Sequence, residues 1–262
     1  MNYSIFDPTG NITALVEDAV EVSLQPAVAS KFMQKHPEVE QVGFFSVESD
    51  PPALRMAGGE FCGNASMSAA ALRCLRLGLS APNTVCISVS GAEKPVEVSL
   101  TAQEGETFSA SVRMPRARMI SVLDFTLDSR SGTLPVVWMQ GICHIVIEPD
   151  SAFFPLREAP ETAERAVRLW CRELKADGLG LMFLDRSSLT PLVFVPGCDS
   201  VFWERSCASG TAAAGMYLAS KTGREVDLAL AEPGGILRVE SSVRTGETRL
   251  YGSTRRMQTI SE

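Results

Sequence analysis

Apolar positions along the first half of the chain alternate between a helical period and a strand period. The predicted elements are, in order, a helix over 23–35 with Pro26 in its first turn, strands over 40–48 and 52–57, a small-residue helix after Cys62, and strands over 85–90 and 95–100. A glycine followed by an apolar, β-branched run at 8–18 precedes them.

The second half repeats this order. Its predicted elements are a glycine and β-branched run at 139–150, a helix over 159–175 opened by Pro160, strands over 177–185 and 191–196, a small-residue helix after Cys207, and strands over 226–231 and 236–240. A match in the same order is hard to obtain by accident. We therefore predict two copies of one unit that mixes helices and strands.

The two cysteine segments carry the repeat most clearly. The first reads GGEFCGNASMSAAALRCLRLG and the second WERSCASGTAAAGMYLASKTG, and 207 − 62 gives an offset of 145. At this offset Gly78 meets Gly223, and each glycine is suited to the position just after a helix. Cys62 and Cys207 are then expected at equivalent places, each at the start of the central helix of its unit.

This organisation predicts an α+β fold with two domains. The first covers 1–120 and carries Cys62, and the second covers 121–252 and carries Cys207, while a tail at about 253–262 packs back onto the first. Two copies of one unit normally pack around a pseudo-two-fold axis and face each other across a cleft, which is a usual place for a ligand. We expect both thiols to line that cleft.

Composition narrows the function. The 262 residues carry 24 Lys and Arg against 31 Asp and Glu, a net charge of −7, with no basic block, which argues against a nucleic-acid partner. No basic and apolar leader opens the chain and no run of 18 apolar residues occurs, so we expect a cytoplasmic protein without a membrane partner. We expect a small-molecule substrate and leave a homodimer open.

The remaining cysteines suggest no metal site. The chain has seven cysteines, an odd number, with no CxxC pair and no HExxH partner. We expect reduced thiols and no bound metal. Those outside the matched pair are expected to pack as small apolar residues, and they are Cys74, Cys86, Cys143, Cys171 and Cys198.

Paired thiols suit the inversion of a stereocentre. A thiol at a helix N-terminus feels the positive end of the helix dipole, which lowers its pKa and makes a thiolate accessible near neutral pH. A thiolate that removes a proton from one face, opposite a thiol that delivers one to the other face, inverts the centre in both directions. The first amides of the two helices, at 63–65 and 208–210, can bind a substrate carboxylate.

The motifs resemble the diaminopimelate epimerase-like fold family. FCGNAS at 61–66 and CASGT at 207–211 are similar to its two cysteine motifs. TGN at 9–11, before the first cysteine motif, and GICH at 141–144, between the two, are similar to further motifs of the family in the same order. The resemblance implies two half-barrel domains, each a mostly antiparallel sheet around a central helix. It also implies a racemase or epimerase that uses no pyridoxal phosphate or other cofactor, with Cys62 and Cys207 as acid and base.

Within that family the chain resembles histidine racemases of the staphylopine type, which supply D-histidine to opine metallophore synthesis. The shared motifs are PTGN at 8–11, EQVGF at 40–44, EFCGNA at 60–65, WERSC at 203–207 and EPGG at 232–235. The chain departs from them at Ala208, where glycine is usual, and at Arg205. Ile142 and Pro191 stand where diaminopimelate epimerases place asparagines, which argues against diaminopimelate as the substrate.

The other predicted site residues are polar groups and backbone amides beside the thiols. We expect Glu40 and Glu204 to orient the thiols or bind the substrate ammonium, and Asn11 and Asn64 to hydrogen-bond the substrate. Substrate contacts are also expected from the residues after each cysteine, namely Gly63, Ala208 and Ser209.

Three other functions stay open at this point. One is diaminopimelate epimerase or another amino-acid racemase on the same fold, and the second is a catalytically silent binding protein. The third is a cysteine hydrolase that uses Cys207 with His144, although a single histidine in an apolar run is more often structural.

Overall fold

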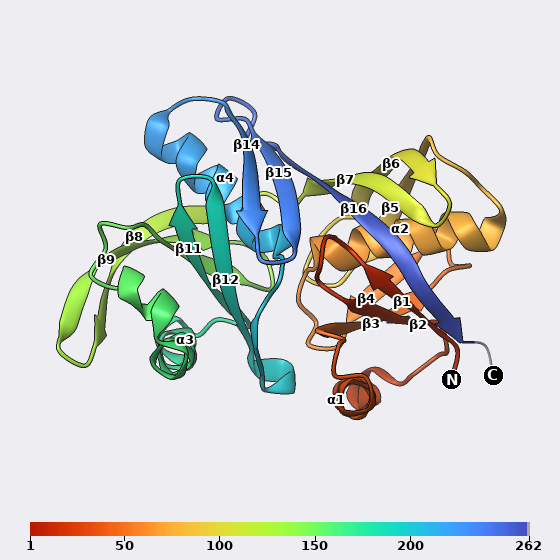
Figure 1. The fold of residues 1–262 in the computed structure, drawn as a ribbon, viewed down its shortest axis with the longest axis horizontal. Coiled ribbons are helices and arrows are strands. Elements are labelled where there is room, and N and C mark those ends of the chain that lie inside the picture. Colours follow the sequence, from red (N-terminus) through yellow and green to blue (C-terminus); the bar gives the residue numbers. More distant parts are fainter. Residues whose placement is uncertain (261–262) are drawn as a thin grey trace.

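A single connected sheet of 16 strands organises the protein, whose computed structural model describes residues 1–260, apart from the side chain of Cys198 (Figure 1). The strands are β1 (Tyr3–Asp7), β2 (Thr13–Val16), β3 (Gln41–Ser46), β4 (Ala53–Met56), β5 (Asn83–Val89), β6 (Val96–Glu104), β7 (Thr107–Met114), β8 (Met119–Leu127), β9 (Arg130–Trp138), β10 (Cys143–Ile147), β11 (Leu179–Asp185), β12 (Ser188–Val195), β13 (Ser200–Trp203), β14 (Val226–Glu232), β15 (Gly235–Ser241) and β16 (Thr248–Ile260).

The strand order repeats along the chain. The series β1-β2-β3-β4-β5-β6-β7 has parallel pairs at β2–β3 and β4–β5 and antiparallel pairs elsewhere. The series β9-β10-β11-β12-β14-β15-β16 has parallel pairs at β10–β11 and β12–β14 and antiparallel pairs elsewhere. The predicted α+β fold with mostly antiparallel strands is therefore confirmed.

β16 links the two series of strands. It pairs with β15 over 248–251, with β7 over 248–255 and with β1 over 255–260. The β1 pairing closes the first series into a barrel, and Figure 1 shows β16 running from one lobe to the other. The division at residue 120 stays a prediction. Of the predicted tail, 253–260 lies in β16, and 261–262 lie outside the described residues.

Within residues 1–260, four α-helices pack against this sheet, namely α1 (Gln25–Lys35), α2 (Gly63–Leu77), α3 (Pro160–Leu174) and α4 (Ala208–Thr222). Short 3-10 turns occur at Val22–Leu24, Phe154–Glu158 and Pro196–Cys198. α2 contacts β5, β6, β7 and β16, while α4 contacts β14, β15, β16 and β10, so each is the central helix of its series. α1 packs on β3 and α3 on β11 and β12 from outside.

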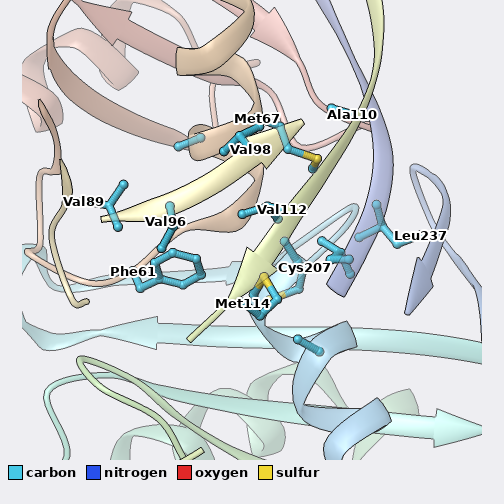
Figure 2. Close-up of a cluster of buried hydrophobic side chains, with 14 of the residues drawn as sticks. Phe61, Met67, Val89, Val96, Val98, Ala110, Val112, Met114, Cys207 and Leu237 are labelled. Atoms are coloured by element: carbon cyan, nitrogen blue, oxygen red, sulfur yellow. The ribbon is translucent and has the colours of Figure 1, made fainter. Parts of the chain in front are cut away.

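The central helices follow from their sequences. Small side chains dominate the N-terminal halves of both, over 63–71 and 208–215, so these halves can be buried all round without filling the space that the strands need. Each ends at a glycine in the left-handed region, Gly78 with φ 64° and Gly223 with φ 65°. The buried side chains around α2 continue through Met114 to Cys207, so one apolar core joins the two lobes (Figure 2).

The packing of the unmatched cysteines is confirmed for three of them. Cys74, Cys143 and Cys171 are buried, but Cys86 is exposed. Cys86 lies on β5 between Val85 and Ile87, whose side chains face the core, and alternation along a strand turns it outward. Cys198 lies outside the described side chains. Over 1–260, no helix combines the length and the apolar character needed to cross a bilayer.

Candidate active site

Cys62 and Cys207 cap the two central helices. The Cys62 sulfur accepts a hydrogen bond from the Ala65 amide at 3.3 Å, and the Cys207 sulfur accepts one from the Gly210 amide, also at 3.3 Å. Each thiol thus takes the position that a side-chain oxygen usually fills at a helix start. Both cysteines line the same pocket.

The helix starts touch directly after the cysteines. A Cβ atom built on Gly63 would lie 2.8 Å from the Cβ of Ala208, so glycine is required for this approach. Gly63 and Ala208 are equivalent in the repeat, since both follow the cysteine by one residue. The first amides of an α-helix have no carbonyl partner within it, and both helices bring these amides and the positive ends of their dipoles to the pocket.

Apart from Gly63, every predicted site residue lines this pocket. These residues are Asn11, Glu40, Cys62, Asn64, Glu204, Cys207, Ala208 and Ser209. They come from both series of strands and both central helices, so the fold brings together residues that are far apart in the chain. Gly63 contributes the helix contact instead.

Two asparagines hold the loop that precedes Cys207. Asn11 Nδ2 donates to the Ser206 carbonyl at 3.0 Å, and Asn64 Nδ2 donates to the same carbonyl at 3.1 Å. Asn11 Nδ2 also lies within hydrogen-bond distance of Glu40 Oε2, at 3.2 Å. The asparagines of the first half therefore position the second cysteine, a role that the sequence did not reveal.

Glu232 is a buried carboxylate that the sequence analysis did not assign to the site. Its Oε2 accepts a hydrogen bond from the Cys207 amide at 2.7 Å, and its Oε1 accepts one from the Thr211 hydroxyl at 2.5 Å. Glu232 thus fixes the cysteine and the first turn of α4 together. The signal was present in EPGG, but only the pairing of β14 with its neighbours brings that motif to Cys207.

Gln41 is a second missed residue, and it faces the other thiol. The Cys62 thiol donates to Gln41 Oε1 at 3.2 Å. Gln41 Nε2 donates in turn to Asn11 Oδ1 and to Thr13 Oγ1. The Cys62 thiol therefore bonds the amide of Gln41, whereas the Cys207 thiol bonds the carboxyl group of Glu204 and also feels the charge of Glu232. The equivalent thiols have unequal surroundings.

The carboxyl groups of the site are hard to ionise. Burial is the main cause that raises the pKa of Glu204 to about 8, with the charges of Glu40 and Glu60 acting in the same direction and hydrogen bonds from Cys207 and Asn11 acting against it. Burial raises the pKa of Glu40 to about 7 and that of Glu232 to about 8. A cation placed among these groups would favour their ionised forms.

The expectation of a lowered thiol pKa is wrong for this state of the protein. Burial raises the pKa of Cys62 to about 12, with the charges of Glu204 and Glu60 adding to the effect of burial. Burial also raises the pKa of Cys207 well above its usual range, together with the charge and hydrogen bond of Glu204. Desolvation and neighbouring carboxylates outweigh the helix dipole, which is worth only about 0.3–2 kcal/mol.

The rest of the pocket wall is largely apolar, and Glu60 interrupts it. Aliphatic and aromatic side chains from both series of strands form this wall, and they are Met33, Val42, Ala57, Phe61, Ile142, Val193, Val195 and Phe202. Glu60 is the first residue of the EFCGNA motif, but the sequence analysis did not assign it to the site. Ile142, which argued against diaminopimelate, does line the pocket, while Pro191 is not among the lining residues.

His144 is separated from this site. It lies on β10, fully buried, and neither ring nitrogen has a hydrogen-bond partner. It does not line the pocket, and burial lowers the pKa of its imidazole to about 3. The arrangement gives a hydrolase that pairs Cys207 with His144 no support. Within residues 1–260, apart from the side chain of Cys198, no three His, Cys, Asp or Glu side chains are arranged to hold a metal ion.

Solved structures share the fold across the whole chain. A probable proline racemase from Agrobacterium radiobacter superposes with a TM-score of 0.71 at 13% identity, covering 100% of this chain and 92% of the other. A protein from Pseudomonas aeruginosa described as a predicted epimerase gives a TM-score of 0.69 at 17% identity, covering 100% and 98%. At these identities the likeness concerns the fold, and it confirms the predicted epimerase-like architecture.

Sequence relatives add the class of activity. A histidine racemase from Fusobacterium nucleatum is 32% identical over 229 residues, which cover 83% of this chain and 81% of the relative. A histidine racemase from Staphylococcus aureus is 28% identical over 248 residues, which cover 92% and 88%. With the fold and the two-thiol pocket, these relatives define the protein as an isomerase, a racemase. A family model described as the histidine racemase CntK N-terminal domain matches residues 1–252. The chain belongs to the histidine racemase family.

Proposed function

We propose that the protein inverts the α-carbon of histidine with Cys62 and Cys207 as paired acid and base. The observation that carries the proposal is the placement of two thiols at equivalent helix starts that line one pocket. One thiolate removes the α-proton from one face, and the opposite thiol delivers its own proton to the other face. The first cysteine ends as a thiol and the second as a thiolate, so the reverse reaction uses the same groups in exchanged roles.

The helix starts would hold the substrate carboxylate. The amides of Gly63 and Asn64 on α2, and of Ala208 and Ser209 on α4, belong to first turns that meet at the pocket. These amides also stabilise the negative charge that spreads onto the carboxylate when the α-proton leaves. The proposed chemistry therefore needs only groups of the chain itself, and we propose no cofactor.

The carboxylates beside Cys207 would bind the substrate ammonium. Glu204 and Glu40 lie in the pocket together with Asn11. An ammonium ion placed there offsets the negative charges that raise the pKa of both thiols. Substrate binding thus makes the thiolate easier to form at the moment when it is needed.

Histidine is the substrate that the relatives from Fusobacterium nucleatum and Staphylococcus aureus support, since both are named histidine racemases. We further propose that the D-histidine formed supplies an opine-type metallophore, on the motifs shared with the staphylopine type. The proposal keeps the cytoplasm as the place of the reaction and makes no choice of oligomeric state.

The test is proton exchange in buffered D₂O with L-histidine. Wild-type protein is expected to form D-histidine that carries deuterium at Cα, without an added cofactor. Cys62→Ser and Cys207→Ser should each lose inversion by at least about 100-fold, since a positioned acid or base contributes about 10²–10⁴ in rate. Cys86→Ser is the matched control, because Cys86 is exposed on β5 and outside the pocket. Near-normal inversion by either pocket variant would refute the two-thiol mechanism.

A further inference from the structure

Glu60 carries a buried oxygen that has no partner. Its Oε2 atom is sealed from water and makes no hydrogen bond, although the residue lines the pocket. A buried acceptor without a donor costs about 1–3 kcal/mol, so such an atom calls for an explanation. Asn64 Oδ1 is in the same situation in the same pocket. Two residues that line the pocket therefore each carry a buried acceptor atom without a hydrogen-bond donor.

The two acceptors belong to different parts of the pocket. Asn64 lies in the first turn of α2, and its side-chain nitrogen donates to the Ser206 carbonyl, so this residue lies beside the loop before Cys207. Glu60 precedes the helix. A Cβ built on Gly58 would lie 2.5 Å from Glu60 Oε2 and 2.5 Å from Val195 Cγ1, so glycine leaves the room in which these two side chains approach each other.

The surroundings of Glu60 suit a flat side chain with an N–H group. Val195, Val193 and Ile142 are apolar and line the pocket together with it. The polar network of Asn11, Glu40 and the loop before Cys207 does not include Glu60. An apolar wall with one unsatisfied acceptor matches an aromatic ring that presents carbon edges and an N–H group, such as imidazole.

The charge of Glu60 also favours a hydrogen-bond donor on the substrate side chain. Burial raises the pKa of Glu60, against backbone hydrogen bonds from Glu60 and Gly58 and the charge of the Arg55 guanidinium, which all lower it. The charge of Glu60 in turn raises the pKa of both Glu204 and Cys62. An α-ammonium bound at Glu204 and Glu40 leaves the charge of Glu60 without a substrate partner. A second donor on the substrate, in its side chain, relieves that repulsion and gives Oε2 its hydrogen bond.

We propose that Glu60 is a specificity-determining residue whose carboxylate accepts a hydrogen bond from a ring N–H of the substrate side chain. The inference rests on the proposed function, because it names the part of the pocket that distinguishes histidine from other amino acids. A buried acceptor discriminates strongly, since a side chain that lacks the N–H leaves the acceptor unpaired.

The test compares substrates in Glu60→Gln and in wild type. We measure deuterium exchange at Cα for L-histidine and L-methionine, which share the α-carbon groups and differ in the side chain. Glu60→Gln is expected to lower kcat/KM for histidine by roughly 10- to 100-fold, mainly through KM, with little change for methionine. Glu173→Gln is the control, because Glu173 is exposed on α3. Equal losses for both substrates, or unchanged selectivity, would overturn the assignment.

A second measurement uses the wild-type protein, so folding of a variant does not limit it. L-Histidine methylated at one or the other ring nitrogen is offered in the same exchange assay. Methylation of the nitrogen that donates to Glu60 should lower kcat/KM at least about tenfold more than methylation of the other. Equal activity on both analogues and on histidine would overturn the inference alone. Wild-type protein that exchanges no histidine would refute the proposed function, and this inference with it.

Discussion

The contact between the two helix starts makes a quantitative prediction for Gly63→Ala. Gly63 is the first residue of α2, and its φ is not in the left-handed region, so alanine fits the backbone there. Helix propensity alone would make the variant more stable by up to about 1 kcal/mol. The contact with Ala208 predicts the opposite sign, because the new Cβ would lie 2.8 Å from the Cβ of Ala208.

The size of the effect follows from that distance. Carbon atoms pack at about 3.5–4.0 Å, so the two helix starts must separate by roughly 1 Å. Overpacking of this kind costs about 1–3 kcal/mol, and about 2 kcal/mol would lower the Tm by roughly 4–8 °C in a chain of this size. A displacement of about 1 Å between catalytic groups can also cost about 100-fold in rate.

The double variant Gly63→Ala with Ala208→Gly moves the methyl group from one helix to the other. It should recover most of the lost Tm and kcat/KM, while Ala208→Gly alone should cost less than about 1 kcal/mol. Thermal unfolding by circular dichroism and the Cα exchange assay measure both effects in all four proteins. If Gly63→Ala is as stable and active as wild type, or if the double variant is no better, the contact does not constrain the site.

Three further predictions concern ionisation. The value of kcat/KM should fall as pH is lowered through about 8, because protonated Glu204 cannot balance the substrate ammonium. In Glu204→Gln, kcat/KM should be low and should not fall further in this pH range. A pH profile of the variant that matches that of wild type would contradict the role of Glu204 in binding the ammonium. The same variant should be more stable than wild type at pH 8, since the raised pKa of Glu204 destabilises the folded state increasingly above pH 4.5. Burial lowers the pKa of His144 from 6.5 to about 3, so the unfolded state takes up a proton that the folded state does not as pH falls below 6.5. The free energy of unfolding is then about 2 kcal/mol lower at pH 5 than at neutral pH. His144→Leu should therefore lose less stability than wild type between pH 7 and 5 in denaturant titrations, and parallel losses would refute this account.

The repeat predicted much of the architecture because the elements it rests on are local. Both central helices begin after the predicted cysteines and end at Gly78 and Gly223. The helix predicted over 23–35 begins at Gln25, after a 3-10 turn at Val22–Leu24. The strands β7, β8 and β9, which form the β6–β7 and β8–β9 hairpins, were not predicted, and neither was the three-way pairing of β16. Their pairing partners lie far apart in the chain or present polar residues on one face.

The site was predictable where residues adjoin the cysteines and less so elsewhere. Asn64, Glu204 and Ser209 follow from their distance to a thiol along the chain. Gln41 and Glu232 reach the thiols only through strand pairing, which one sequence does not reveal. The sequence analysis expected a lowered thiol pKa, whereas the pKa of both thiols is raised. The reason is related, because one sequence does not show how many buried carboxylates the fold brings close to each sulfur.

The unequal surroundings of the two thiols have a consequence for the two directions of the proposed reaction. L- and D-histidine have equal free energies in water, so at equilibrium the two enantiomers are present in equal amounts. The ratio kcat/KM must then be identical for both, whatever groups surround each sulfur. The amide beside Cys62 and the carboxylates beside Cys207 can change kcat and KM only in proportion, so the enantiomer with the lower KM is also the one that turns over more slowly at saturation.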